Sequence, residues 1–243
     1  MAVTVPPAAV ETGRDIPLNI SVVNTGDEAA YDVQLSLMLP DGFEAEPIPV
    51  GLLPPNAPYA DSFRVRVADS VKPGTYPAVL KTHYADANAY PFSTVSPAFI
   101  RYGQSTPNRL QGRLRELSLA GERTGELVLE AGNLDDRPHT VSVRLHLPDE
   151  LVAEYYSRTV EVRPRGAEKV GFQVKSLGAL PDSSYAVFAT MEYDEGGLHY
   201  SSAAGGVVRI LSGDAGGADF MSWLPPAALV ALISLFIYIQ FRR

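Results

Sequence analysis

The chain of 243 residues is long enough for two domains of about 100 residues each and one further segment. Acidic residues outnumber basic ones by 28 to 20, and a net charge of −8 supplies no counter-charge for a phosphate backbone, so we expect no nucleic-acid partner. There is no cysteine, which excludes disulfides, cysteine-ligated zinc and a thiol nucleophile. The 20 glycines and 20 prolines are spread along the sequence and divide it into short segments, as in all-β proteins.

The first predicted elements are strands that bury one face. Apolar and polar residues alternate over residues 18–22 and again over 33–37, which is the period-two pattern of such strands. Between them NTGDEA predicts a turn, in which Asp27 accepts backbone hydrogen bonds. Residues 72–96 then read as a Pro-Gly turn, a strand, an acidic hairpin and a returning strand. Short strands separated by turns about every 8 to 12 residues are typical of a β-sandwich.

The same pattern recurs farther along the chain, at an offset of roughly 108 to 109 residues, which is the length of one sandwich domain. The matching residues are Asn24 with Asn133, Pro40 with Pro148, Asp41 with Asp149, Phe63 with Phe172, Pro73 with Pro181, Tyr76 with Tyr185, and Tyr84 with Tyr193. The segment RYGQSTPN between the copies has the composition of a domain boundary. A repeat of this period predicts two similar units that each bury their own core.

We therefore predict an all-β protein with two tandem immunoglobulin-like antiparallel β-sandwiches, followed by one C-terminal transmembrane α-helix. The predicted segments are a first sandwich at residues 1–101, a linker at 102–108, a second sandwich at 109–211, a flexible tether at 212–222, the transmembrane helix at 223–241 and a cytoplasmic basic tail at 242–243.

The segment from Trp223 to Phe241 carries no formal charge. At about 1.5 Å per residue it forms a helix of roughly 28 Å, close to the hydrocarbon thickness of a bilayer. Pro225 and Pro226 fall in its first turn, where a missing N–H costs nothing. Trp223 and Tyr238 stand near its two ends, as interfacial aromatic residues do. A buried core helix is the alternative, but such a helix usually has a polar face.

The orientation of this span follows from charge. Arg242 and Arg243 follow it, whereas the preceding segment carries Asp214 and Asp219, so the positive-inside rule predicts a cytoplasmic C-terminus and N-terminal domains outside the cell membrane. Export requires a signal peptide, and the sequence from Met1 has neither a basic segment nor an apolar one, so we expect that a signal peptide has been removed or omitted. The alternative is a tail-anchored protein with cytoplasmic domains, which would have to translocate the two arginines.

The predicted span also has small residues, which let a neighbouring helix approach closely. They are Ala227, Ala228, Ala231 and Ser234. Alanine is common in membrane spans, so these residues indicate a helix-packing face only weakly. The predicted partners are therefore the lipid bilayer and other membrane or envelope proteins.

Several short motifs resemble a known family. They are NTGDEAAYDV at 24–33, LPDGF at 39–43, GLLPP at 51–55 and KPGTYP at 72–77. These motifs resemble the alpha-galactosidase-associated Ig-like domain, and they are similar to the cell-adhesion-related bacterial domain (CARDB) and to S-layer-type surface proteins. The resemblance covers most of residues 1–101 and, more faintly, residues 109–211. It implies a non-catalytic, exported β-sandwich that spaces, displays or docks something.

The histidines lack the i, i+4 helical spacing of a zinc protease motif. They are His83, His139, His146 and His199, of which the first and last each precede a tyrosine and are expected on a strand surface. Acidic turns at 27–28, 135–136 and 194–195 offer oxygen ligands of the kind that calcium prefers, but two adjacent carboxylates are usually a solvated hairpin. We expect no metal and no cofactor.

Catalytic signatures do not occur in the sequence. There is no Gly-x-Ser-x-Gly elbow and no glycine-rich phosphate loop between a strand and a helix, so we expect no catalytic residues and no enzyme. Aromatic residues instead favour a binding face for a protein or a glycan. The candidates are Tyr84, Tyr90, Phe92, Phe99, Tyr155, Tyr156, Tyr193 and Tyr200. The predicted function is a membrane-anchored structural or interaction protein, such as an accessory subunit of a membrane or envelope complex, with a carbohydrate-binding or adhesion module as the alternative.

Overall fold

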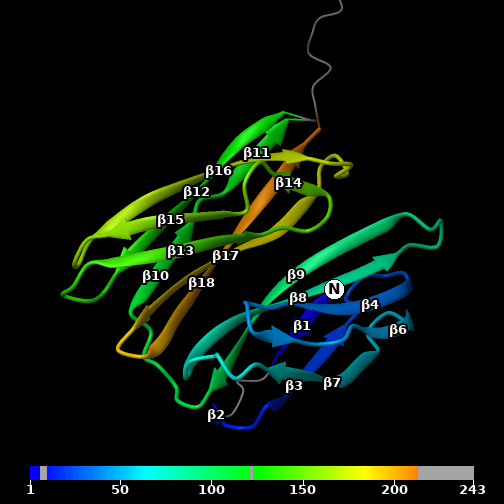
Figure 1. Ribbon diagram of the computed structural model, residues 1–243. Helices are drawn as coiled ribbons and strands as arrows, with labels where there is room; N and C mark the ends of the chain where they lie inside the picture. Colours follow the sequence, from blue (N-terminus) through cyan, green and yellow to red (C-terminus); the bar gives the residue numbers. More distant parts are fainter. Residues whose placement is uncertain (6–9, 121–122, 213–243) are drawn as a thin grey trace, which may run out of the picture.

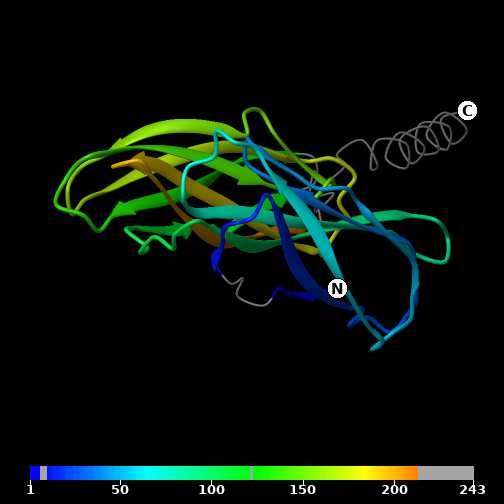
Figure 2. The same cartoon turned by 60° about the horizontal axis from the view of Figure 1, so that its bottom comes forward.

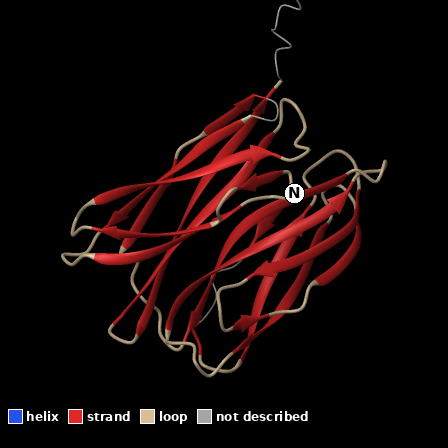
Figure 3. Ribbon diagram, turned by 45° about the horizontal axis from the view of Figure 1, so that its top comes forward, coloured by secondary structure: helices blue, strands red, loops and turns tan. Residues whose placement is uncertain are grey.

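The computed structural model describes residues 1–5, 10–120 and 123–212, and these residues form strands and loops with no helix (Figures 1 and 3). We call residues 1–102 the N-terminal half and residues 110–212 the C-terminal half. The strands of the N-terminal half are β1 (Ala2–Thr4), β2 (Val10–Glu11), β3 (Asp15–Val23), β4 (Ala30–Met38), β5 (Phe43–Glu44), β6 (Ile48–Leu53), β7 (Pro58–Val67), β8 (Gly74–Ala85) and β9 (Pro91–Tyr102). Those of the C-terminal half are β10 (Leu110–Leu114), β11 (Leu117–Ala120), β12 (Thr124–Asn133), β13 (His139–His146), β14 (Leu151–Ala153), β15 (Ser157–Val162), β16 (Ala167–Ser176), β17 (Ser184–Glu195) and β18 (Leu198–Leu211).

Each half contains two sheets that enclose apolar side chains between them. In the N-terminal half the sheet β1-β3-β7-β5 faces the strands β9, β8, β4 and β6. In the C-terminal half the sheet β10-β12-β16-β14 faces β15, β13, β17 and β18. The all-β, sandwich-like architecture predicted from the alternation of residues is therefore confirmed for the described part of the chain. In Figures 1 and 2 the two halves lie next to each other.

The predicted alternation places the core. Leu18, Ile20 and Val22 are at most 2% exposed, and Val33 and Leu35 on the opposite sheet are equally buried. The buried hydrophobic residues form two separate clusters. One contains only residues between 16 and 100, and the other only residues between 110 and 210. The predicted linker lies between these clusters, and residues 103–109 contain no strand.

A buried asparagine closes the end of the N-terminal core. Asn24 is 5% exposed, and its side-chain N–H groups donate to the backbone carbonyls of Glu28 at 2.7 Å and Leu53 at 3.0 Å. Its Oδ1 atom accepts from the backbone N–H of Gly26 at 3.0 Å. The acceptor in the NTGDEA turn is therefore Asn24, whereas the sequence pattern assigned that role to Asp27. Because β3 and β4 belong to opposite sheets, this turn carries the chain from one sheet to the other.

Asn133 makes the same contacts in the C-terminal half. It is 2% exposed and donates to the carbonyls of Arg137 at 2.6 Å and Val162 at 3.2 Å, while its Oδ1 accepts from the N–H of Asp135 at 2.8 Å. The sequence separations of 4, 29 and 2 residues are identical in both halves. The repeat therefore extends to individual hydrogen bonds.

The two halves are also joined by backbone hydrogen bonding. β18 pairs with β8 in parallel through one bridge, His199 with Gly74, which links the facing sheets into a ten-stranded sheet. The His199 N–H donates to the Pro73 carbonyl at 2.9 Å, and a Cβ atom on residue 74 would collide with the His199 backbone. Glycine is required here because the two backbones approach so closely.

None of the described residues forms a helix long and apolar enough to cross a bilayer. The predicted transmembrane helix at 223–241, with its interfacial aromatic residues and its packing face, lies outside the described residues, as do the tail at 242–243 and the predicted tether beyond Ser212.

Candidate binding pocket at the junction

The junction, by which we mean the contact region between the N-terminal and C-terminal halves, is held by a buried carboxylate. Glu150 is 6% exposed, and its two carboxylate oxygens accept from the backbone N–H of Ser93 at 2.8 Å and from the Ser93 hydroxyl at 2.9 Å. The Ser93 Oγ atom in turn accepts from the N–H of Asp149 at 2.6 Å. A buried charge is expensive unless it is hydrogen-bonded, so this arrangement makes Ser93, at the edge of β9, a specific partner for Glu150.

The neighbouring carboxylate of Asp149 binds two side chains of β8. Lys81 Nζ forms an ion pair with Asp149 Oδ1, and His83 Nδ1 lies 3.1 Å from Asp149 Oδ2. His83 is on the strand surface, as predicted. Asp149 is the residue that the repeat matches with Asp41. In the structure it is also a contact with the other half.

Three aromatic side chains line a pocket beside these contacts. Tyr84 and Phe92 stack with their ring centroids 5.5 Å apart, and Tyr90 packs on Phe92 at 5.1 Å. The Tyr90 hydroxyl donates to the Gly178 carbonyl at 2.8 Å and thus ties the β8–β9 hairpin to the C-terminal half. The pocket has a volume of about 420 Å³. A smaller hollow of about 220 Å³ shares Tyr84, Phe92 and Glu150 with it.

A β-bulge supplies another carboxylate to this pocket. The register of β4 shifts between Tyr31 and Gln34, and Asp32 has a φ of 50°. Bulges redirect side chains, and aspartate tolerates this left-handed conformation better than most residues. Asp32 thereby lines the pocket together with Asp149 and Glu150. Burial, together with the charge of Glu150, raises the pKa of Tyr84. Aromatic faces beside carboxylates suit a polar ligand with an apolar face.

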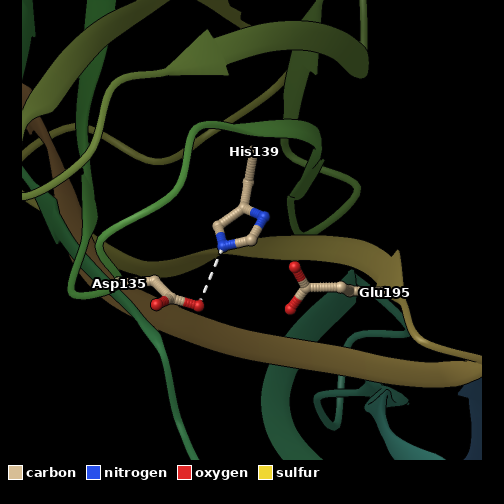
Figure 4. A group of neighbouring side chains, drawn as sticks. All are labelled: Asp135, His139 and Glu195. Atoms are coloured by element: carbon tan, nitrogen blue, oxygen red, sulfur yellow. Dashed lines mark hydrogen bonds and ion pairs between the residues drawn. The ribbon is translucent and has the colours of Figure 1, made fainter.

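A second polar cluster lies at the opposite end of the C-terminal half (Figure 4). The ligand-type atoms of Asp135, His139 and Glu195 lie within 4.8 Å of one another, so the fold brings together two acidic turns that lie far apart in the sequence. Arg109 Nη1 lies 2.8 Å from Asp135 Oδ2 and 3.0 Å from Glu195 Oε2. The guanidinium therefore stands between the two carboxylates, where a metal ion would have to bind. Sequence reasoning missed Arg109, because nothing local connects it with residues 135 and 195.

An aromatic stack packs against this ion-pair cluster. Tyr193 stacks on Tyr200 at 4.9 Å and on His139 at 4.1 Å, and the Arg109 guanidinium lies 5.0 Å from the Tyr200 ring centroid. Both tyrosines are 6% exposed. Burial raises the pKa of Tyr193 to about 12. These candidate interface residues therefore belong to the core.

His199 was predicted on a strand surface, but the structure buries most of its side chain. Its side chain is 11% exposed and stacks on Tyr76 with ring centroids 4.0 Å apart. Its Nδ1 atom lies 2.8 Å from Asp194 Oδ1, and the other oxygen of Asp194 binds Lys72 Nζ at 2.7 Å. The close approach of β8 covers His199, which the pattern within β18 does not reveal. These residues line a polar cleft of about 560 Å³ on the other side of the junction.

The remaining aromatic candidates are dispersed. Tyr155 and Tyr156 are 57% and 44% exposed between β14 and β15, where the Arg158 guanidinium lies 5.6 Å from the Tyr155 ring centroid. Phe99 is half-buried on β9. Of the predicted aromatic face, the structure thus brings together Tyr84, Tyr90 and Phe92 in the junction pocket.

The first repeat matches a known family. Residues 10–85 match the model of the NPCBM-associated, NEW3 domain of alpha-galactosidase, which confirms the resemblance to an alpha-galactosidase-associated domain family. No curated protein sequence matches the chain significantly. The family match over these residues, together with the sandwich-like sheets, indicates a β-sandwich surface or interaction module.

The solved structures that match this chain are distant from it in sequence. The YadV chaperone is 15% identical, with 84% of this chain and 100% of that one covered and a TM-score of 0.33. The Escherichia coli chaperone DraB is 10% identical, with coverages of 84% and 96% and a TM-score of 0.34. A mutant Salmonella alpha-2-macroglobulin is 12% identical, with coverages of 86% and 16% and a TM-score of 0.37.

Proposed function

We propose that this chain is a membrane-anchored, extracytoplasmic and non-enzymatic interaction protein that packs on a larger membrane or envelope complex as an accessory subunit. Its folded part consists of two tandem Ig-like domains at residues 1–101 and 109–211, and its helix at 223–241 crosses the bilayer. The observation that carries the proposal is the junction between the two halves: Glu150, Asp149 and Gly178 of one half each contact the other half through hydrogen bonds or ion pairs.

A junction held by several contacts supports a structural role. The contacts at Ser93 and Tyr90 lie on one side of the junction, and the His199 contacts lie on the other. Contacts on both sides resist hinge bending, so a partner meets both halves in one fixed arrangement. Pre-organisation of this kind reduces the entropy that binding would otherwise cost.

The proposal is tested by comparing the full chain with a chain that ends at Gly213. The full chain is expected in the membrane fraction after a salt and carbonate wash, and the shorter chain in the soluble fraction as a folded protein. Protease added to intact cells should digest both halves, because the proposal places them outside the cell membrane. Cross-linking before detergent extraction should then yield a defined complex only with the anchored chain. A full chain that is removed by carbonate would contradict the proposal.

A carbohydrate-binding or adhesion function is the second candidate, and the junction pocket favours it, because Tyr84, Tyr90 and Phe92 form an aromatic wall beside carboxylates. A glycan array probed with the full chain in nanodiscs tests it. Binding should disappear in Tyr90→Ala and persist in Tyr155→Ala, which removes an exposed tyrosine that does not line the pocket. Equal loss in both variants, or no binding by the parent chain, would rule this function out.

A further inference from the structure

Exposed apolar side chains gather at the end of the molecule where the described chain stops. Leu177, Leu180 and Leu211 are 61%, 40% and 47% exposed, and Tyr90 is 39% exposed. We call these four residues the exit rim. Single exposed apolar residues are ordinary, but a group of them at one place marks an interaction surface.

Contacts between the segments show that these residues are neighbours. The Ile210 N–H donates to the Ser183 carbonyl at 2.9 Å, and the Ser212 N–H donates to Asp182 Oδ1 at 3.1 Å. The end of β18 is therefore held against the loop that carries Leu177 and Leu180. Tyr90 reaches the same loop through its hydrogen bond to the Gly178 carbonyl.

The loop itself is well anchored. The Leu177 N–H donates to the Glu150 carbonyl at 2.7 Å, and the Leu180 N–H donates to the Tyr185 hydroxyl at 3.1 Å. Because the backbone is held at both positions, the leucines are presented outward from a fixed frame.

The length of chain beyond the rim limits what can lie opposite it. Only residues 213–222 separate Ser212 from the uncharged segment that begins at Trp223. Even fully extended, about ten residues reach at most about 35 Å, and a glycine-rich chain of that length spans about 17 Å on average. If the segment from Trp223 lies in a bilayer, the exit rim is the part of the described structure closest to the point where the chain enters the lipid.

We propose that the exit rim rests on the membrane surface, with Leu177, Leu180, Leu211 and Tyr90 contacting the interfacial region of the lipid. This inference rests on the proposed membrane anchoring. Leucine and tyrosine suit that region, since apolar side chains partition into it and tyrosine keeps its hydroxyl in contact with polar groups. The folded part is thereby held in one orientation on the bilayer, with the opposite end, around Leu134, farthest from it.

The opposite end supplies the control position. Leu134 is 41% exposed, and its N–H donates to the Arg109 carbonyl near Glu195, the last residue of β17. The exit rim adjoins Ser184, the first residue of that strand. A strand of 12 residues at about 3.3 Å per residue separates the two ends by roughly 40 Å.

The absence of cysteine in the sequence allows single spin labels to be placed without background. The full chain in phosphatidylcholine vesicles would be labelled at Leu177→Cys, Leu180→Cys, Leu211→Cys or Leu134→Cys. Collision of the label with oxygen, which dissolves in lipid, is then compared with collision with a water-soluble nickel complex. We expect the ratio of oxygen to nickel collisions to be several-fold higher at the three rim positions than at Leu134→Cys.

A charge variant sharpens the test. With the label at Leu211→Cys, the pair Leu177→Asp and Leu180→Asp should lower the ratio to that of the control position, whereas Leu134→Asp should leave it unchanged. Flotation of the same vesicles reports on the anchor. A chain that does not float refutes the anchoring and the rim contact together, whereas a chain that floats with water-exposed rim labels refutes the rim contact alone. Labels shielded from both reagents would overturn the lipid contact in favour of a second protein chain.

Discussion

The two halves of the molecule share their internal framework and differ in what surrounds it. Phe63 and Phe172 occupy equivalent core positions, each 1% exposed and each opposite a leucine of the neighbouring strand. The equivalent pairs Tyr84 with Phe92 and Tyr193 with Tyr200 both stack, although the first pair is half-buried and the second is buried. Core packing and the asparagine contacts are thus retained in both copies, which indicates that they are what the fold requires.

The differences lie at the periphery of this framework. Ala30 of the first half corresponds to His139 of the second, which stacks on Tyr193 and adjoins the Arg109 ion pairs. Conversely, the bulge that carries Asp32 into the junction pocket has no counterpart in β13, whose pairing with β15 is regular. The C-terminal half therefore contains the Arg109 ion-pair cluster, which the described residues of the N-terminal half lack, and the N-terminal half contributes a bulge to the junction pocket.

The largest expected effect comes from truncation of the equivalent phenylalanines. Phe63→Ala and Phe172→Ala each leave a cavity in a closed core and should lower the free energy of unfolding by about 3–5 kcal/mol. Hydrogen exchange of the full chain should show increased exchange first in the half that carries the change. Tyr155→Ala, at an exposed position, is the control and should have little effect. Equal loss of protection in both halves would show that the two cores unfold as one.

Removal of the buried asparagines should cost somewhat less. Asn24→Ala and Asn133→Ala each leave two backbone carbonyls and one N–H without their partner, so we expect a loss of about 2–4 kcal/mol in each case. Urea unfolding of both variants measures it. Asn19→Ala changes an exposed asparagine on β3 and should stay close to the parent chain. A clear difference between the two variants would mean that the shared hydrogen bonds differ in their energetic roles.

An acid-sensitive position distinguishes the halves further. Burial, with a smaller contribution from the charge of Arg144, lowers the pKa of His146 to about 4. In the unfolded chain this group has a pKa of about 6.5 and takes up a proton between these values, so the free energy of unfolding should fall by about 3 kcal/mol as the pH drops from 6.5 to 4. Met38 holds the equivalent position in the first half.

His146→Met is therefore the matched variant. The difference in unfolding free energy between pH 7 and pH 4 should be smaller in this variant than in the parent chain by the same amount, since the other titrating groups are common to both. An unchanged pH dependence would show that folding does not lower the pKa of His146.

The smallest expected effect concerns metal ions at the Asp135, His139 and Glu195 cluster. Because Arg109 lies between the carboxylates, neither EDTA nor added calcium or zinc should shift the Tm of the parent chain measurably. Arg109→Gln removes the internal cation and should allow zinc to raise the Tm. Arg137→Gln, which changes an arginine 3.7 Å from Glu195 at the edge of the cluster, should respond as the parent chain does. A drop in the parent Tm with EDTA would establish a metal site.

The strands, the buried faces and the position of the repeat were determined by the sequence itself. The alternation over 18–22 and 33–37 is a local signal, because each side chain of a strand points to the face opposite its neighbours. The recurrence of Asn24 as Asn133 indicated a shared structural role, although their hydrogen bonds became clear only in the structure. Family motifs in residues 10–85 were recognisable because turns require particular residues.

Contacts between distant segments were decided only by the tertiary structure. Local patterns carry no information about which edge of one half meets the other. Periodicity therefore could not predict the hydrogen bonds between Glu150 and Ser93, the bridge at Gly74, or the packing of Tyr76 on His199. The same holds for Arg109, which meets Asp135 and Glu195 because the turn after β12 and the hairpin between β17 and β18 converge at one end of the fold. Sites formed by convergence of this kind depend on the relative placement of whole strands, which the long-range packing of the two cores determines.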